Sequence, residues 1–211
     1  MPAAAARASL VPSSAMVEPI ELSVAYTNGT FEYRQTMSPR LEKLADRIDA
    51  LSTAVGRAVA WCLLFMVLAE FALVLMRYVL GVGSIWLQES VLYAHGALFM
   101  LAAAWTLAAD GHVRVDIFYA DAAPRTKAAV DLVGALLLLL PFALTLLVLS
   151  WGYAGRSWAH LEGSREISGL PAVFLLKSLI PLFAALLALQ GIAQALRAAL
   201  VLTGAAATRA R

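Results

Sequence analysis

Residues 86–118 read WLQESVLYAHGALFMLAAAWTLAADGHVRVDIF, and this stretch decides the fold class. Its first part is apolar and long enough to cross a bilayer, yet it contains Gln88, Glu89 and His95, and it ends at a polar segment, residues 110–116. Polar side chains are costly in lipid, so a membrane helix that keeps them is expected to place them against protein. The stretch therefore predicts a membrane-spanning helix that works as part of a larger assembly.

The composition is that of an integral membrane protein. Of the 211 residues, 62% are hydrophobic and only 14% are charged, values far from those of a soluble domain. The net charge of +2 is too small to indicate nucleic acid as a partner. The one cysteine, Cys62, cannot form an internal disulfide and indicates no redox compartment.

Four apolar spans divide most of the chain, at residues 57–80, 86–109, 128–153 and 174–202. Each is near or above the length needed to cross hydrocarbon. They predict an all-α membrane protein whose transmembrane domain covers residues 57–203. Only five residues join the first two spans, so these two are expected to be antiparallel neighbours.

The sequence before the first span divides into two parts. Residues 1–37 are weakly patterned and predict a disordered tail. Residues 38–56 then begin with Ser38 and Pro39, a typical helix start. Apolar residues recur at helical spacing through this second segment, which predicts an amphipathic helix at the membrane surface or against a partner. The alternative is a solvated lead-in to the first span.

Lysine and arginine set the expected orientation. Ten of those near the spans fall on one side and four on the other, namely Arg77, Arg156, Arg165 and Lys177. By the positive-inside rule both termini are cytoplasmic, including the tail at residues 204–211. The segment 110–116 is then cytoplasmic, and the loop at 154–173 faces outward.

Two pairs of polar residues are predicted between the first two spans. Counted from the short turn, Glu70 and His95 reach similar depths, as do Arg77 and Glu89. We therefore expect a deeper Glu70–His95 contact and an outer Arg77–Glu89 contact. The alternatives are that these residues bond to a partner subunit, or that Glu70 binds a transported ion or proton. Small residues such as Gly96 are further candidates for close helix approach.

No catalytic or cofactor site is predicted. Haem in a four-helix membrane anchor needs paired histidines, and no two of His95, His112 and His160 share a depth on different helices. His112 and Asp116 lack the further ligands of a metal site. We expect no catalytic residue, no metal and no cofactor, and the chain is not expected to be an enzyme.

Several short motifs resemble the small membrane subunit (DctQ-like) of tripartite ATP-independent periplasmic (TRAP) transporters. The resemblance covers residues 57–202 and is carried by Arg77-Tyr78, Trp86 with Gln88-Glu89, Gly111 to Asp116, Glu166 to Pro171, Lys177, Pro181 and Leu189-Gln190-Gly191.

The resemblance implies a function that the spans alone do not. It implies a scaffold subunit in a bacterial inner membrane that braces a large multi-helix transport subunit. It also implies sodium-coupled uptake of organic-acid-type solutes, delivered by a periplasmic solute-binding protein. Residues expected to contact the partner or to end helices are Trp86, Asp110, His112, Arg114, Asp116, Glu166 and Lys177. The alternatives are a four-helix anchor of a respiratory or other membrane enzyme complex, and a small autonomous transporter.

Overall fold

The computed structural model describes residues 22–27, 30–35, 39–113, 119 and 121–203. Four helical stretches are long and apolar enough to cross a membrane, which confirms the predicted all-α membrane domain with four spans. The elements in chain order are β1 (Leu22–Thr27), β2 (Thr30–Gln35), α1 (Pro39–Tyr78), α2 (Ile85–Ala108), α3 (Pro124–Gly134), a π-helical segment (Ala135–Leu139), α4 (Leu140–Ala159) and α5 (Val173–Leu202).

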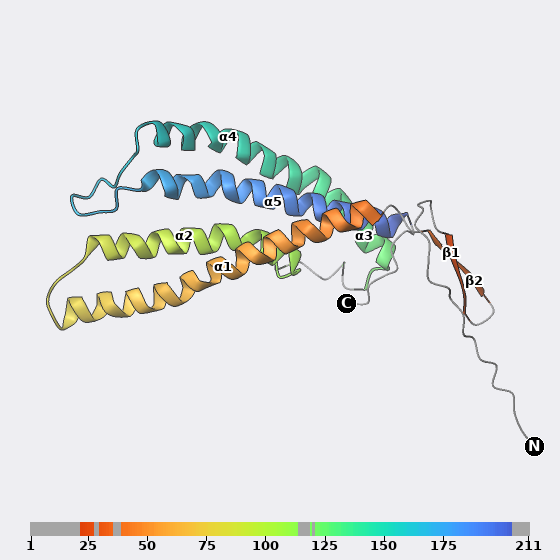
Figure 1. Cartoon of the computed structure of the whole chain (residues 1–211), viewed down its shortest axis with the longest axis horizontal. Helices are drawn as coiled ribbons and strands as arrows, with labels where there is room; N and C mark the ends of the chain where they lie inside the picture. The colour runs from red at the N-terminus through yellow and green to blue at the C-terminus, as the bar shows by residue number, and fades with distance from the viewer. Residues whose placement is uncertain (1–21, 28–29, 36–38, 114–118, 120, 204–211) are drawn as a thin grey trace, which may run out of the picture.

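The helices form two antiparallel pairs, α1 with α2 and α4 with α5 (Figure 1). The α1–α2 turn and the α4–α5 loop lie at one end of the bundle, while the start of α1, α3 and the end of α5 lie at the other. Helix α5 packs against α1, α2, α3 and α4. A third of its most apolar window, 33%, is buried, compared with 6–11% in the other spans. Helix α5 is therefore the centre of the bundle.

Helix α1 combines two predicted elements in one. It runs without a break through 40 residues, about 60 Å at 1.5 Å per residue. The hydrocarbon core is only ~30 Å thick, so α1 extends well beyond it. Residues 39–56 of the predicted amphipathic segment form the first part of this helix, and the buried Ala45 and Ile48 pack on Ala193 of α5.

The third span contains a local change of helix type. Residues Ala135–Leu139 are π-helical, and the Leu140 N–H donates to the carbonyl of Ala135. Pro141 follows directly and has no N–H to give. A proline also clashes with the carbonyl four residues before it, and a wider turn at this point relieves that clash. The span therefore continues unbroken from Pro124 to Ala159.

Small residues bring the helices close together. A Cβ added to Gly56 of α1 would lie 2.5 Å from the Trp105 ring of α2. A Cβ on Gly96 would lie 3.2 Å from Leu176, so the helix that approaches Gly96 is α5 of the same chain. Most of the buried apolar side chains are alanines. Such packing suits a membrane protein, because lipid gives little hydrophobic drive between helices.

The strands β1 and β2 form an antiparallel hairpin within the predicted disordered tail. Thr27 pairs with Thr30, so the strands are joined by two residues, which are Asn28-Gly29 in the sequence. Asn-Gly between alternating apolar residues is the strongest short-range hairpin signal, and this local signal accounts for the two strands. Residues 1–21 and 204–211 lie outside the described part of the chain.

Candidate functional site

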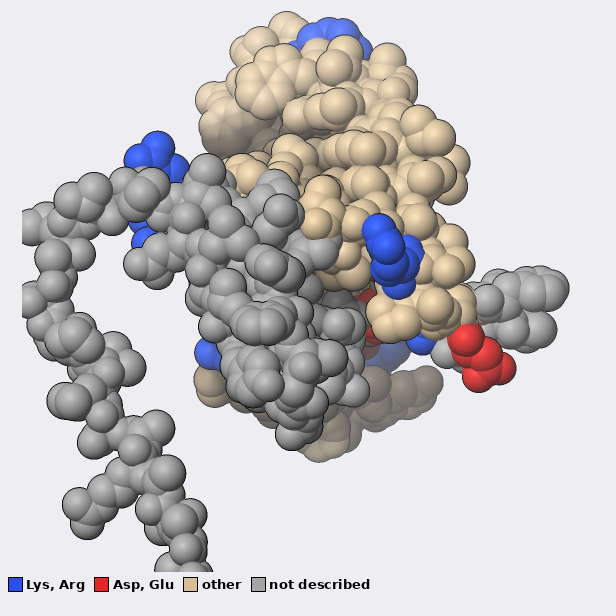
Figure 2. Space-filling model, turned by 90° about the vertical axis from the view of Figure 1, so that its right-hand side faces the viewer, with Lys and Arg blue, Asp and Glu red and all other residues tan. Residues whose placement is uncertain are grey.

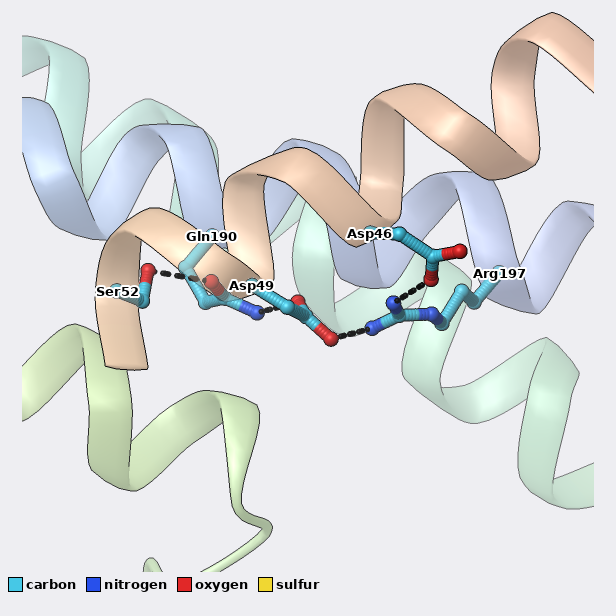
Figure 3. A network of polar contacts seen from close by, with 5 residues as sticks. All are labelled: Asp46, Asp49, Ser52, Gln190 and Arg197. Atoms are coloured by element: carbon cyan, nitrogen blue, oxygen red, sulfur yellow. Dashed lines mark hydrogen bonds and ion pairs between the residues drawn. The ribbon is translucent and has the colours of Figure 1, made fainter. Parts of the chain in front are cut away.

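Five polar side chains join α1 to α5, and we call them the α1–α5 network (Figure 3). Ser52 Oγ donates to Gln190 Oε1 at 2.7 Å, and Gln190 Nε2 donates to Asp49 Oδ1 at 2.8 Å. Arg197 completes the network through ion pairs of 2.5 Å to Asp49 and 3.0 Å to Asp46. The residues recur at 46, 49 and 52 on α1 and at 190 and 197 on α5, so each helix contributes one face.

The network is buried at Ser52 and Gln190, whereas the ion pair between Arg197 and Asp46 is partly exposed. Gln190 and Ser52 are each only 2% exposed. Arg197 and Asp46 retain 35% and 57% of their side-chain exposure. A fully satisfied buried network fixes one helix register, because any shift leaves polar groups unpaired. The network therefore determines how α1 sits on α5.

The network also has a defined position along the bundle. Gly56 of α1 contacts Trp105, near the last residue of α2, Ala108. Residues 46–52 lie about 6–15 Å along α1 from Gly56, whereas α2 continues for only about 4.5 Å beyond Trp105. The network therefore lies past the end of α2. This is the end of the bundle at which the polar segment after α2 also lies.

Sequence reasoning did not assign any member of this network to a site. Asp46 and Asp49 lie in the segment 38–56 that is predicted to be an amphipathic helix, and Arg197 lies near the end of the fourth predicted span. Gln190 carried the clearest signal, since an amide within an apolar span needs a partner. Its partner could not be found from the sequence, because it lies 138–141 residues away.

A second group of polar contacts holds the α4–α5 loop, and we call it the loop network: Glu89, Ser157, Glu162, Ser164, Leu170 and Lys177. Glu162 accepts from Ser157 Oγ at 2.7 Å and from Lys177 Nζ at 2.5 Å. Lys177 also lies 4.3 Å over the Tyr153 ring. Next to it, Trp158 Nε1 donates to Ser178 Oγ at 2.6 Å. The start of α5 is thereby tied to the end of α4.

Charge affects the titration of Glu162. The hydrogen bond from Lys177 is the largest cause of a lowered pKa for this carboxyl, followed by the hydrogen bond from Ser157. Both bonds favour the ionised form. At neutral pH the Glu162–Lys177 pair is therefore ionised and intact.

Glu89 of α2 joins the same loop. Its carboxylate accepts from Ser164 Oγ and, at 2.5 Å, from the Leu170 N–H. This corrects the expected outer contact, because no hydrogen bond or ion pair between Arg77 and Glu89 occurs in the described residues. Arg77 is exposed on α1. The partners of Glu89 lie in the α4–α5 loop, 75 and 81 residues further along the chain, so a comparison of the first two spans alone does not reveal them.

The deeper predicted contact is not formed either. Glu70 and His95 are both exposed, and no hydrogen bond joins them in the described part of the chain. His95 instead stacks on Phe99 of its own helix, with ring centroids 6.3 Å apart. The Gly56–Trp105 contact sets a register about four residues away from the one that the expected pairs assume. That offset is roughly 6 Å along the helices.

The polar segment after α2 begins as a helix-ending motif. Asp110 has φ 58°, its N–H donates to Leu107, and the Gly111 N–H donates to Thr106 at 2.8 Å. This is the pattern of a Schellman cap, in which a left-handed residue ends the helix. His112 is exposed, whereas Arg114 and Asp116 lie outside the described residues.

The other predicted contact residues take three positions. Trp86 is 54% exposed at the start of α2, beside the α1–α2 turn. Glu166 is exposed in the α4–α5 loop, where its backbone N–H donates to Ser164 Oγ at 3.1 Å and its backbone carbonyl accepts from the Gly169 N–H at 3.1 Å. Lys177 belongs to the loop network. Among the described residues, no group of three or more His, Cys, Asp or Glu could hold a metal ion.

Comparison with known proteins identifies one family. The family model described as "Tripartite ATP-independent periplasmic transporters, DctQ component" matches residues 66–201. Neither the search of curated proteins nor the search of solved structures finds a match. The matched range begins within α1 and ends one residue before the end of α5. It therefore includes every residue of the loop network, and it includes Gln190 and Arg197 of the α1–α5 network.

Proposed function

Because this chain belongs to the DctQ-component family of TRAP transporters, and is therefore a small TRAP transporter subunit, we propose that it acts as a scaffold. In this role it braces the large transport subunit of a sodium-coupled transporter for organic-acid-type solutes. The subunit itself binds no solute. A periplasmic solute-binding protein delivers the solute to the assembly.

The scaffold proposal rests mainly on one observation: polar side chains join the helices at both ends of the bundle. The α1–α5 network closes one end of the bundle, and the loop network closes the other. Both networks include α5, the most enclosed helix. Their polar atoms bond to one another and fix helix positions, and a rigid bundle of this kind suits a brace.

The proposed orientation places both termini in the cytoplasm of a bacterium and the α4–α5 loop on the outer side of its inner membrane. Basic side chains lie at several places around the end of the bundle where α1 begins, which supports this orientation by the positive-inside rule (Figure 2). Protease added to the outside of intact spheroplasts should cut at the exposed Arg165 and spare residues near the termini.

Reconstituted uptake tests the function. Vesicles that contain both membrane chains, with the binding protein outside, are expected to accumulate solute only under an imposed sodium gradient. Omission of the small chain should abolish uptake. Sodium-driven uptake by the small chain alone would refute the scaffold role and would favour a transport site at Glu70 instead.

A further inference from the structure

Glu70 lies on the exposed surface of a membrane-spanning helix. Its neighbour Ala69 is 5% exposed and faces the bundle, whereas Glu70 faces away from it. The end of α1 is Tyr78, eight residues further on, so Glu70 lies about 12 Å from it along the axis. Tyr78 is 82% exposed and Trp86 is 54% exposed near the turn. Exposed aromatic residues of this kind mark the membrane–water interface.

A carboxylate at that depth is not stable against lipid. A glutamate side chain is too short to reach the interface, and charged groups within the hydrocarbon are costly unless they are paired. No hydrogen bond or ion pair to Glu70 occurs among the residues that the structure describes. The described part of the chain therefore leaves this acceptor without a donor in the membrane region.

The same face of α1 carries an apolar hollow. It is shallow and open, and its lining residues are Ala60, Trp61, Leu63, Leu64 and Val67. Leu63, Val67 and Glu70 follow at spacings of four and three, so they share one helical face. Leu63 and Val67 are 56% and 59% exposed, respectively. An apolar recess and a polar acceptor thus lie within one helical turn of each other.

We propose that this face of α1 docks a transmembrane helix of another protein, which fills the hollow and places a basic side chain against Glu70. The inference rests on the proposed function, and within that assembly the docked helix belongs to the large membrane subunit. A second copy of this chain fits less well. Two copies related by an axis along the membrane normal would bring two Glu70 carboxylates to the same depth, where they would repel.

Site-specific photo-crosslinking in the membrane tests the docked face without removal of Glu70. A benzophenone amino acid at position 67 should crosslink to the large subunit. The matched control is position 148, another exposed valine in a membrane-spanning helix, at 73% exposure. The control should give at least several-fold less of this product. Adducts at position 67 with a second copy only, or with lipid only, would overturn the proposal, and so would equal yields at both positions.

Substitution of Glu70 tests the polar contact. In co-purification with the large subunit, Glu70→Leu should reduce recovery roughly tenfold, the effect of one interhelical contact worth about 1.4 kcal/mol. Glu70→Gln should retain an intermediate amount, because its amide oxygen still accepts a hydrogen bond. Thr145→Leu, also polar to leucine at an exposed span position, should leave recovery unchanged.

The two proposals fail in different ways. Full recovery with Glu70→Leu, when the wild type co-purifies, would overturn the docked face and leave the scaffold function intact. A wild-type chain that never co-purifies with the large subunit would overturn the scaffold function itself.

Discussion

Substitution of Gln190 by leucine should destabilise the bundle more than any other single change to the α1–α5 network. Gln190 is 2% exposed and bonds both Ser52 and Asp49. Leucine has a similar volume, so the change removes two hydrogen bonds without opening a large cavity. It leaves the Ser52 hydroxyl and one Asp49 oxygen without these partners.

The magnitude follows from the two contacts. A neutral hydrogen bond between membrane helices contributes ~0.6 kcal/mol on average. A hydrogen bond to a charged group contributes about 1.5–3 kcal/mol. Asp49 keeps its 2.5 Å ion pair with Arg197, which limits the loss to the lower part of the summed range. We expect a loss of about 2 kcal/mol in the free energy of unfolding, roughly a 30-fold change in the equilibrium.

The assay is reversible unfolding in mixed micelles, followed by tryptophan fluorescence. Gln194→Leu is the matched control, because Gln194 lies one turn further along α5 and its side chain makes no hydrogen bond among the described residues. A double-mutant cycle with Ser52→Ala should give a coupling energy of about 0.5–1 kcal/mol. If Gln190→Leu costs no more than Gln194→Leu, the network does not stabilise the bundle and the reasoning fails.

Three other outcomes are expected. Gly56→Ala should lower the stability of the bundle by about 1–3 kcal/mol through overpacking, because its Cβ would lie 2.5 Å from the Trp105 ring. Gly155→Ala should leave the stability unchanged, since a Cβ there meets no neighbouring atom within 4 Å. Equal effects of the two substitutions in thermal unfolding would contradict this packing. Glu89→Ala should release the α4–α5 loop and speed tryptic cleavage after Arg165 roughly tenfold, since it removes two charge-assisted bonds. Glu42→Ala, an exposed position on α1 outside this loop, should leave the rate unchanged, and a similar acceleration in both variants would argue against the Glu89 contact. Lys177 and Ser157 lower the pKa of Glu162. The contribution of Glu162 to stability is therefore fully present above the ordinary glutamate pKa of about 4.3 and is lost as pH falls through the lowered value. Glu162→Gln should reduce the loss of stability at acid pH, and an unchanged loss would contradict the role of the Glu162–Lys177 pair.

Two kinds of local pattern in the sequence have different outcomes. The apolar spans were predicted, whereas the hairpin was not. The four spans were predicted correctly because a run of about 20 apolar residues meets its requirement locally, whatever the helix later packs against. The hairpin at β1 and β2 was missed although Asn28-Gly29 is an equally local signal.

The pairing of polar residues depended on helix register and helix rotation, which the sequence does not contain. A shift of about four residues in the α1–α2 register separates the expected Glu70–His95 pair from the packing that Gly56 and Trp105 impose. Each step of one residue also turns a side chain by about 100° around its helix. For this reason Glu70, next to the buried Ala69, faces outward.

The sequence by itself therefore determined that this is a four-span membrane protein, since length and hydropathy along the chain suffice for insertion into lipid, and its motifs implied the family. Only the tertiary structure decided which polar groups hold the subunit together and which remain for a partner. Gln190 finds Ser52 and Asp49, and Glu89 finds Ser164 and Leu170. Glu70 is left on the surface of α1 because helix rotation and register, set by small residues at the contacts, are properties of the packed bundle.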